Sequence, residues 1–158
     1  MGINRGKQFE DKLKVQFEQI PNLSIDRLYD VTTGYINQNN ICDFIVFKEG
    51  TLNYFECKAI HGSTLNFKSH IRENQWKGLL DKSYIGGVNA GIICWFIDWD
   101  ITLFIPIQVL EQMKNKGYKS FNIRKDINKC EKVYINGIKK RVFFEYDLEK
   151  FLEEISYE

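Results

Sequence analysis

The sequence predicts a single α/β domain in which a mixed β-sheet is flanked by helices. The chain has 158 residues, the usual size of one domain, and neither repeats nor low-complexity runs divide it. Helical and β-rich segments are interspersed, but they do not alternate as in a βαβ series. Hydrophobic residues make up 44% and aromatic residues 15%, which is enough for a packed core. We therefore expect residues 1–158 to form a single domain with its own core.

The first expected element is an amphipathic helix over residues 5–19. Phe9, Leu13 and Phe17 recur at helical spacing, so their side chains should share the buried face. Pro21 follows, and the residue before a proline is disfavoured in a helix, so the helix should end there.

Three β-rich runs should follow this helix. A short strand is expected over residues 24–29, and the polar segment 31–40 should be a loop. Two longer runs, over residues 41–47 and 52–60, are separated by residues 48–51, which is the length of a hairpin turn. We expect these two strands to pair antiparallel.

The second half of the chain should contain two further strands, a hairpin and three helices. Residues 88–96 form the most apolar run, so this strand should be central. Asn136-Gly137 is a residue pair preferred in type I′ turns and predicts a hairpin between Val133 and Val142. The other expected elements are a helix over residues 71–80 with Ile71, Trp76 and Leu79 inward, a strand over 101–105, a helix over 107–114, and a last helix capped by Asp147.

Cysteine spacing and the lack of targeting signals bear on the compartment. The four cysteines form no CxxC pair, so neither a zinc site nor a redox dithiol is indicated. We expect no signal peptide and no membrane-spanning segment, because no apolar run reaches about 18 residues. We expect a cytoplasmic protein without membrane contact, whose free thiols are mostly buried: Cys42, Cys57, Cys94 and Cys130.

Charge is unevenly distributed, although the net charge is only +1. Residues 114–141 hold ten basic side chains against two acidic ones, Asp126 and Glu131. This stretch is either a solvated lysine-rich surface or a patch that faces nucleic-acid phosphates, and binding through such a patch would weaken with salt. Charge alone does not choose between the two.

The chemical signal lies in the second strand of the first expected hairpin. Because side chains alternate along a strand, Glu56 and Lys58 should share one face, while Phe55, Cys57 and Ala59 point to the core. A carboxylate and an ammonium group would thus be held side by side on an anchored backbone. A Glu-x-Lys triplet also arises by chance as a surface ion pair, and that alternative stays open.

Asp43 is expected in the preceding strand, where antiparallel pairing should bring it close to Glu56. Two carboxylates repel unless a cation lies between them, and Mg²⁺ prefers such hard oxygen ligands. With Lys58 as an added positive charge, this group would support metal-assisted phosphodiester hydrolysis. Nucleophilic triads have no support, because His61 and His70 lack suitable partners and should be surface or loop residues.

These residues also resemble a known family. Asp43 followed by Glu56-Cys57-Lys58 resembles the active-site motif of the PD-(D/E)XK nucleases, which have a restriction-endonuclease-like fold. With further motifs, the chain resembles the RecU-type Holliday junction resolvases over about residues 4–105. These motifs are Asn4-Arg5-Gly6, Phe9-Glu10, Cys42-Asp43-Phe44, Tyr54 to Ala59, Asn66-Phe67 and Gln75.

The resemblance implies a metal-dependent endonuclease that resolves branched DNA by paired, symmetric phosphodiester cuts. Asp43, Glu56 and Gln75 would bind Mg²⁺, with Mn²⁺ as an alternative, and Lys58 would stabilise the transition state. Glu10 would be either a supporting carboxylate or an exposed helix residue. Symmetric cuts in a four-way junction also imply a homodimer.

Two features depart from the family pattern. Ile41 stands where family members commonly carry Thr, so a side-chain oxygen is missing there. The segment 31–40 would correspond to the family's protruding stalk and is short. Two other functions therefore stay open: a catalytically silent module that binds DNA or a protein partner, and a restriction-type endonuclease on the same fold.

Overall fold

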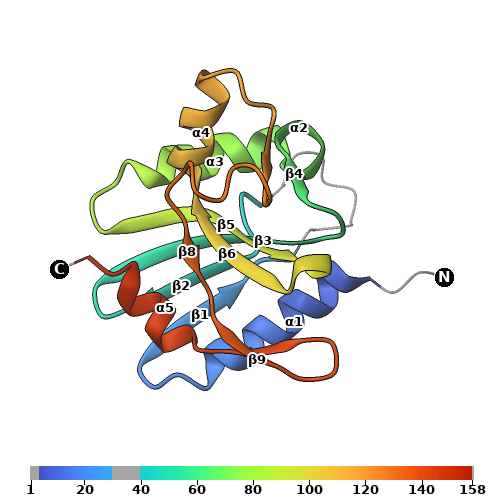
Figure 1. Cartoon of the computed structure of the whole chain (residues 1–158). Coiled ribbons are helices and arrows are strands. Elements are labelled where there is room, and N and C mark those ends of the chain that lie inside the picture. The colour runs from blue at the N-terminus through green and yellow to red at the C-terminus, as the bar shows by residue number, and fades with distance from the viewer. Residues whose placement is uncertain (1–3, 30–39, 158) are drawn as a thin grey trace, which may run out of the picture.

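A six-stranded mixed β-sheet forms the centre of the molecule, and helices cover both of its faces (Figure 1). The computed structural model describes residues 4–29 and 40–157. In spatial order the strands are β1 (Leu23–Arg27), β2 (Phe44–Lys48), β3 (Thr51–Ile60), β5 (Val88–Phe96), β6 (Ile101–Pro106) and β8 (Val133–Tyr134). This architecture confirms the predicted α/β class with a mixed sheet.

The helices and the small strands complete the fold. The helices are α1 (Arg5–Glu18), α2 (Phe67–His70), α3 (Glu73–Ser83), α4 (Ile107–Asn115) and α5 (Leu148–Glu154), with a short 3₁₀ helix, η1 (Ile97–Trp99). Two small sheets pair β4 (Thr64–Asn66) with β7 (Ser120–Asn122), and β9 (Gly137–Lys139) with β10 (Phe144–Tyr146). Helices α1 and α5 cover one face of the central sheet, whereas α3 and α4 cover the other (Figure 1). The expected helices are confirmed, whereas α2, η1, β4 and β7 were not expected.

Helix α1 forms as the apolar spacing predicts. Asn4 caps it, because the Asn4 side chain accepts a hydrogen bond from the Lys7 amide at 3.0 Å. Phe9, Leu13 and Phe17 are buried and belong to the apolar core between α1, α5 and the sheet. Helix α1 therefore packs over the sheet, in contact with β3.

Strand β3 is where the sheet changes direction. It pairs antiparallel with β2 and parallel with β5, and β5 in turn pairs antiparallel with β6. The chain passes from β3 to β5 through α2 and α3, which lie over one face of the sheet. β5 is central, as predicted, and its residues 90–96 are all buried because helices cover the sheet on both sides.

The predicted β2–β3 hairpin forms with a tighter turn than expected. Its turn consists of Glu49 and Gly50, whose φ angles of 50° and 83° are those of a type I′ turn. Pairing begins at Lys48 opposite Thr51. At the other end, β2 begins at Phe44 rather than at residue 41, because the Asp43 side chain interrupts the pairing with β3.

The hairpin predicted at Asn136-Gly137 is wrong. β8 pairs with β6, whereas β9 pairs with β10, so this residue pair connects strands of two different sheets. A type I′ turn needs a positive φ at Gly137, and Gly137 does not have one. A β-carbon added there would lie 2.4 Å from the carbonyl oxygen of Glu145. Gly137 therefore allows β9 and β10 to approach each other closely, and it does not form a turn.

The other expectations concern the cysteines, the last helix and the segment 31–40. All four cysteines are free, and Cys130 alone among them is only partly buried. Asp147 caps α5 as predicted, accepting from the Lys150 amide at 3.1 Å. Apart from Asn40, the segment predicted as a loop lies outside the described residues. In the part of the chain that is described, no helix has the length and apolar character needed to cross a membrane.

Candidate active site

The predicted site residues Glu56, Lys58 and Gln75 meet where β3 passes the first turn of α3. Lys58 Nζ lies 2.9 Å from Glu56 Oε2. Gln75 Nε2 donates a hydrogen bond to the same Glu56 oxygen at 3.0 Å. Glu56 is only 3% exposed, so this contact is not the surface ion pair that a chance Glu-x-Lys triplet would give.

Asp43 lies directly before β2 and not within a strand as expected. Its Oδ2 atom accepts a hydrogen bond from the Cys57 amide at 2.8 Å. Its own amide donates to Phe55 O at 3.0 Å, and its carbonyl accepts from the Leu28 amide at 2.8 Å. The Asp43 side chain thus accepts the hydrogen bond of the Cys57 amide, which in a regular antiparallel ladder would donate to a backbone carbonyl of the neighbouring strand. Strand pairing ends there, and the carboxylate is fixed beside β3.

The Gln75 amide is oriented by its two neighbours. Its Oε1 atom accepts a hydrogen bond from the Arg72 amide at 3.1 Å, which is part of a capping box at the start of α3. A backbone N–H can only donate, so the side-chain oxygen must face Arg72 and the NH₂ group must face Glu56. Gln75 therefore presents a donor to the buried carboxylate, and its oxygen keeps one lone pair.

Glu10 is a further carboxylate of the site, and the sequence left its role open. It extends from α1, pairs with Arg27 at 2.9 Å, and lies close enough to Asp43 for the two carboxylates to interact electrostatically. Burial, and then the charge of Asp43, raises the pKa of Glu10 to about 7. Burial, and then the charge of Glu56, raises the pKa of Asp43 to about 7. Near neutral pH each of these carboxyl groups is therefore protonated only part of the time, and a bound metal ion would displace the proton.

The donor set fits a hard divalent cation. Glu56 Oε1 is buried and has no hydrogen-bond partner among the described residues. A buried carboxylate oxygen without a partner costs free energy, and a metal ion would satisfy it. Within residues 4–29 and 40–157, no three His, Cys, Asp or Glu side chains converge as a metal cluster. The ligand set is thus a partial one, as is usual for Mg²⁺, which completes its shell with waters and phosphate oxygens.

Comparison with protein families identifies the chain. A family model described as recombination protein U (RecU) matches residues 4–146, which is most of the sequence. The chain belongs to the RecU family. Membership confirms the family that the motifs predict, that of the RecU-type Holliday junction resolvases.

Comparisons with curated proteins and with solved structures do not extend this family assignment. Curated proteins give no match to this RecU chain. Among solved structures, the chain is similar to Archaeoglobus fulgidus Hjc, described as a Holliday junction resolvase from an archaeal hyperthermophile. The TM-score is 0.48 and the sequence identity is 17%, over 66% of this chain and 78% of that chain.

Ile41, which departs from the pattern that the resemblance implies, packs against α3. A β-carbon added at Gly78 would lie 2.2 Å from Ile41 Cγ2, so the isoleucine fills the space over this glycine. Ile41 also contacts the apolar core beneath α3 and α4. In this chain the position therefore contributes packing and no side-chain oxygen.

The two histidines differ from each other. His61 is exposed, as predicted, and its Nδ1 atom lies 3.0 Å from Asp98 Oδ1. His70 is half-buried and is the last residue of α2, so it lies in a helix and not in a loop. Its Nδ1 atom accepts a hydrogen bond from the Asn66 amide at 2.8 Å. Burial, and then the charge of Lys58, lowers the pKa of His70, which keeps the ring neutral.

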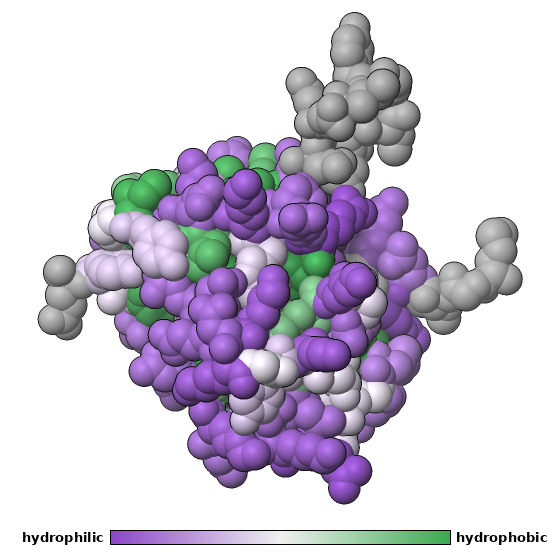
Figure 2. All heavy atoms as spheres, turned by 90° about the horizontal axis from the view of Figure 1, so that it is seen from above, coloured by the Kyte–Doolittle hydropathy of each residue, from purple (hydrophilic) through white to green (hydrophobic). Residues whose placement is uncertain are grey.

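The basic stretch 114–141 is spread over several surface elements. Seen from above, the molecule is largely hydrophilic, with small separate hydrophobic areas (Figure 2). Lys139 Nζ lies 3.0 Å from Asp100 Oδ2, and Lys140 Nζ lies 3.6 Å from Glu145 Oε2. Part of the positive charge is therefore neutralised by nearby carboxylates.

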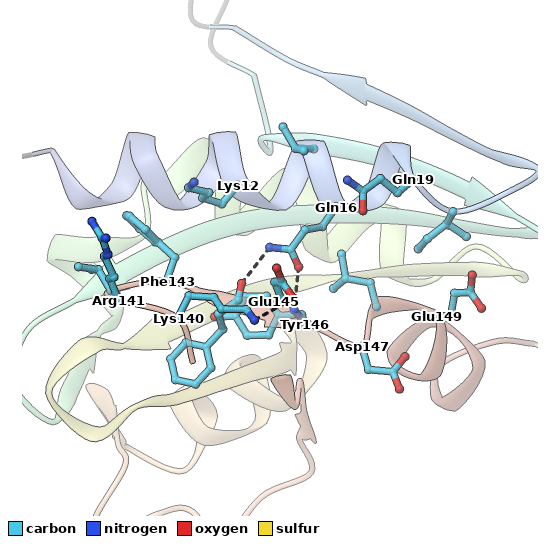
Figure 3. A pocket seen from close by; sticks show the side chains of 15 residues that line it. Lys12, Gln16, Gln19, Lys140, Arg141, Phe143, Glu145, Tyr146, Asp147 and Glu149 are labelled. Carbon is cyan, nitrogen blue, oxygen red and sulfur yellow. Dashed lines mark hydrogen bonds and ion pairs between the residues drawn. The ribbon is translucent and has the colours of Figure 1, made fainter. Parts of the chain in front are cut away.

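A groove of about 910 Å³ lies between α1 and the β9–β10 hairpin (Figure 3). Gln16 bridges it, because its side chain donates to Phe144 O at 2.9 Å and accepts from the Tyr146 amide at 2.7 Å. Lys12 and Arg141 line one end of the groove. None of the predicted site residues lines it, so the groove and the acidic site are separate.

Proposed function

We propose that this RecU chain is a divalent-metal-dependent endonuclease that resolves Holliday junctions. Asp43 and Glu56 would bind the metal, and Lys58 would act as the cationic catalytic group. One observation carries the proposal: Glu56 is buried, with one oxygen bonded to Lys58 and Gln75 and the other without a partner. A carboxylate held in this way has an oxygen left for a metal ion. Family membership supports nuclease activity on branched DNA.

The chain's own residues would divide the work. Mg²⁺, or Mn²⁺ in its place, would supply Lewis acidity, which polarises the phosphate and lowers the pKa of water. The bond from Lys58 fixes Glu56, and the bond from the Cys57 amide fixes Asp43, so neither carboxylate must reorganise to hold a cation. The Lys58 side chain is 23% exposed, so it can reach a phosphate and neutralise the charge that develops on its oxygens.

Gln75 has two proposed roles, as an oxygen ligand of the metal and as the residue that orients Glu56. Its donated hydrogen bond to Glu56 supports the second role. Gln75→Glu separates them, because a carboxylate can bind a metal but cannot donate to Glu56 when ionised. If Gln75 orients Glu56, this variant should bind Mn²⁺ more weakly in a calorimetric titration. Equal or tighter binding would favour the ligand role.

The proposed enzyme acts as a homodimer of single-domain subunits. Resolution needs two cuts related by the two-fold axis of the junction, and a dimer supplies two sites with that symmetry. Sedimentation equilibrium should give twice the chain mass of 18.7 kDa. A monomer at concentrations that support paired cutting would contradict this part of the proposal.

Cleavage of a synthetic four-way junction tests the activity, with a linear duplex of the same sequence as the control substrate. We expect paired nicks in the junction with Mg²⁺ and none with EDTA. Lys58→Ala should bind the junction but not cut it. Lys14→Ala should cut normally, because it removes only one partner of the partly exposed Lys14–Glu18 ion pair on α1.

The other outcomes point to the alternative functions. Equal cutting of the linear duplex would favour a restriction-type endonuclease. Binding without cutting, whichever divalent ion is supplied, would favour a catalytically silent module. Unchanged cutting by Lys58→Ala would remove that residue from the mechanism.

A further inference from the structure

Arg27, at the end of β1, is a partly buried cation that the sequence motifs did not single out. Its side chain is 9% exposed. Nη2 lies 2.9 Å from Glu10 Oε2, and Nη1 binds Asp11. The donors of a guanidinium point in fixed directions, so two separate carboxylate contacts fix the plane of the group.

Aromatic rings and the backbone also hold Arg27. Its guanidinium carbon lies 5.0 Å from the centre of the Tyr29 ring and 6.0 Å from that of the Phe44 ring. Arg27 is the register partner of Phe44 in the β1–β2 ladder. The next residue, Leu28, donates its amide to the Asp43 carbonyl at 2.8 Å. The guanidinium is therefore built into the same corner of the fold as Asp43.

We propose that Arg27 is a positioning residue of the metal site, which holds the Glu10 carboxylate beside Asp43 so that the negative charge of Glu10 favours cation binding by Asp43 and Glu56. This role rests on the proposed function. Glu10 comes from α1 and Arg27 from β1, so their ion pair joins two elements at the site. A purely structural ion pair would not need to keep Glu10 in electrostatic contact with Asp43, because neighbouring like charges cost free energy.

Charge alone predicts the opposite effect on metal binding. Arg27 is a cation close to a cation site, so its charge opposes binding and the loss of that charge would favour it. Positioning predicts weaker binding whenever the guanidinium fork is lost, even if the charge stays. Arg27→Lys makes this distinction, because lysine keeps the charge but has no planar fork.

Calorimetric titration of the DNA-free protein with Mn²⁺ tests the proposal. We expect Arg27→Lys to weaken Mn²⁺ binding about tenfold, the lower end of the range for residues that orient metal ligands. Glu10→Gln should weaken binding by a similar factor. The double variant should bind no more weakly than Glu10→Gln alone, because Arg27 acts through Glu10.

Two further variants control for folding and surface charge. Asp11 is exposed, and Asp11→Asn should weaken one of the two carboxylate contacts of the Arg27 guanidinium. This variant should give a smaller but measurable loss of Mn²⁺ affinity. Lys14→Gln breaks the partly exposed pair with Glu18 on the same helix, and it should bind Mn²⁺ like the wild type. If Arg27→Lys does not fold, Asp11→Asn alone carries the test.

The outcomes separate this role from the proposed function. Wild-type Mn²⁺ affinity in Arg27→Lys or, should that variant not fold, in Asp11→Asn would overturn the role of Arg27. Losses that multiply in the Arg27→Lys/Glu10→Gln double variant would also overturn it. A wild-type protein that binds no Mn²⁺ would overturn the proposed function, and the role of Arg27 with it.

Discussion

The β2–β3 and β9–β10 hairpins hold charge in opposite ways. The β2–β3 hairpin carries Glu56, which is 3% exposed, into a corner shared with Asp43 and Lys58. The β9–β10 hairpin carries Lys139 and Lys140, whose side chains are 46% and 57% exposed and face surface carboxylates. Exposed charges are screened by water and salt, whereas buried ones depend on their partners. The few buried charges should therefore matter far more for function than the many basic residues of the stretch 114–141.

The largest expected effect comes from removing one charge in the buried corner. Asp43→Asn and Glu56→Gln should each lower the rate of junction cleavage by about a thousandfold or more, because metal-based charge stabilisation is worth several kcal/mol. Both variants keep side-chain shape, so circular dichroism should report an intact fold. Asp26→Asn, on the exposed face of β1, is the matched control and should cleave normally. If either site variant cleaved the junction near the wild-type rate, the buried carboxylates would not matter more for function than the exposed charges of the β9–β10 hairpin.

The buried corner should also make stability depend on pH and metal. The pKa values of Glu10 and Asp43 are raised to about 7, from about 4 in an unfolded chain. The folded state thus binds protons more tightly, and this contribution to the free energy of unfolding is complete below about pH 4 and is lost as the pH rises through about 7.

Thermal unfolding measures this dependence. The metal-free protein should melt at a lower temperature at pH 8 than at pH 6, because Glu10 and Asp43 lose their protons in that interval. Mg²⁺ should raise the melting temperature more at pH 8, where it replaces those protons. An equal effect of Mg²⁺ at both pH values would argue against a metal at these carboxylates.

The glycines of the two hairpins should give effects of intermediate size. Gly137→Ala should lower the free energy of unfolding by about 1–3 kcal/mol, because the added carbon meets the Glu145 backbone. Gly50→Ala should cost about 1–2 kcal/mol, because alanine is strained at a φ of 83°. Gly86→Ala, with open space around it, is the control in the same urea titrations. A harmless Gly137→Ala would mean that β9 and β10 can separate easily.

The smallest effects are expected among the surface cations. Lys139→Gln should leave junction binding and its salt dependence unchanged, because Lys139 is already paired with Asp100. Arg141→Gln should lower the slope of log affinity against log salt by about one if Arg141 contacts a phosphate. An unaltered slope in both variants would identify this part of the stretch as solvated surface.

Local patterns in the sequence predicted much of this structure, and contacts between distant residues explain the rest. Spacing of Phe9, Leu13 and Phe17 predicted α1, and strand alternation predicted that Glu56 and Lys58 share a face. The Asn136-Gly137 pair misled, because its conformation depends on contact with Glu145 and not on its own preference.

The supporting residues of the site were the hardest to predict. Arg27 and Glu10 are 17 positions apart and meet only because β1 pairs with β2 while α1 packs over β3. The sequence gives no local signal for such a pair. The Asp43 side chain likewise sets the start of β2 by accepting a hydrogen bond from the Cys57 amide. This hydrogen bond depends on the register of the hairpin.

Anomalous X-ray scattering from crystals soaked in MnCl₂ tests the central claim most directly. We expect an anomalous peak at about 2 Å from Glu56 Oε1 and from the Asp43 carboxylate, with Lys58 and Gln75 still bonded to Glu56 Oε2. A fully soaked crystal with Mn²⁺ bound only elsewhere, and with Glu56 unchanged, would contradict it.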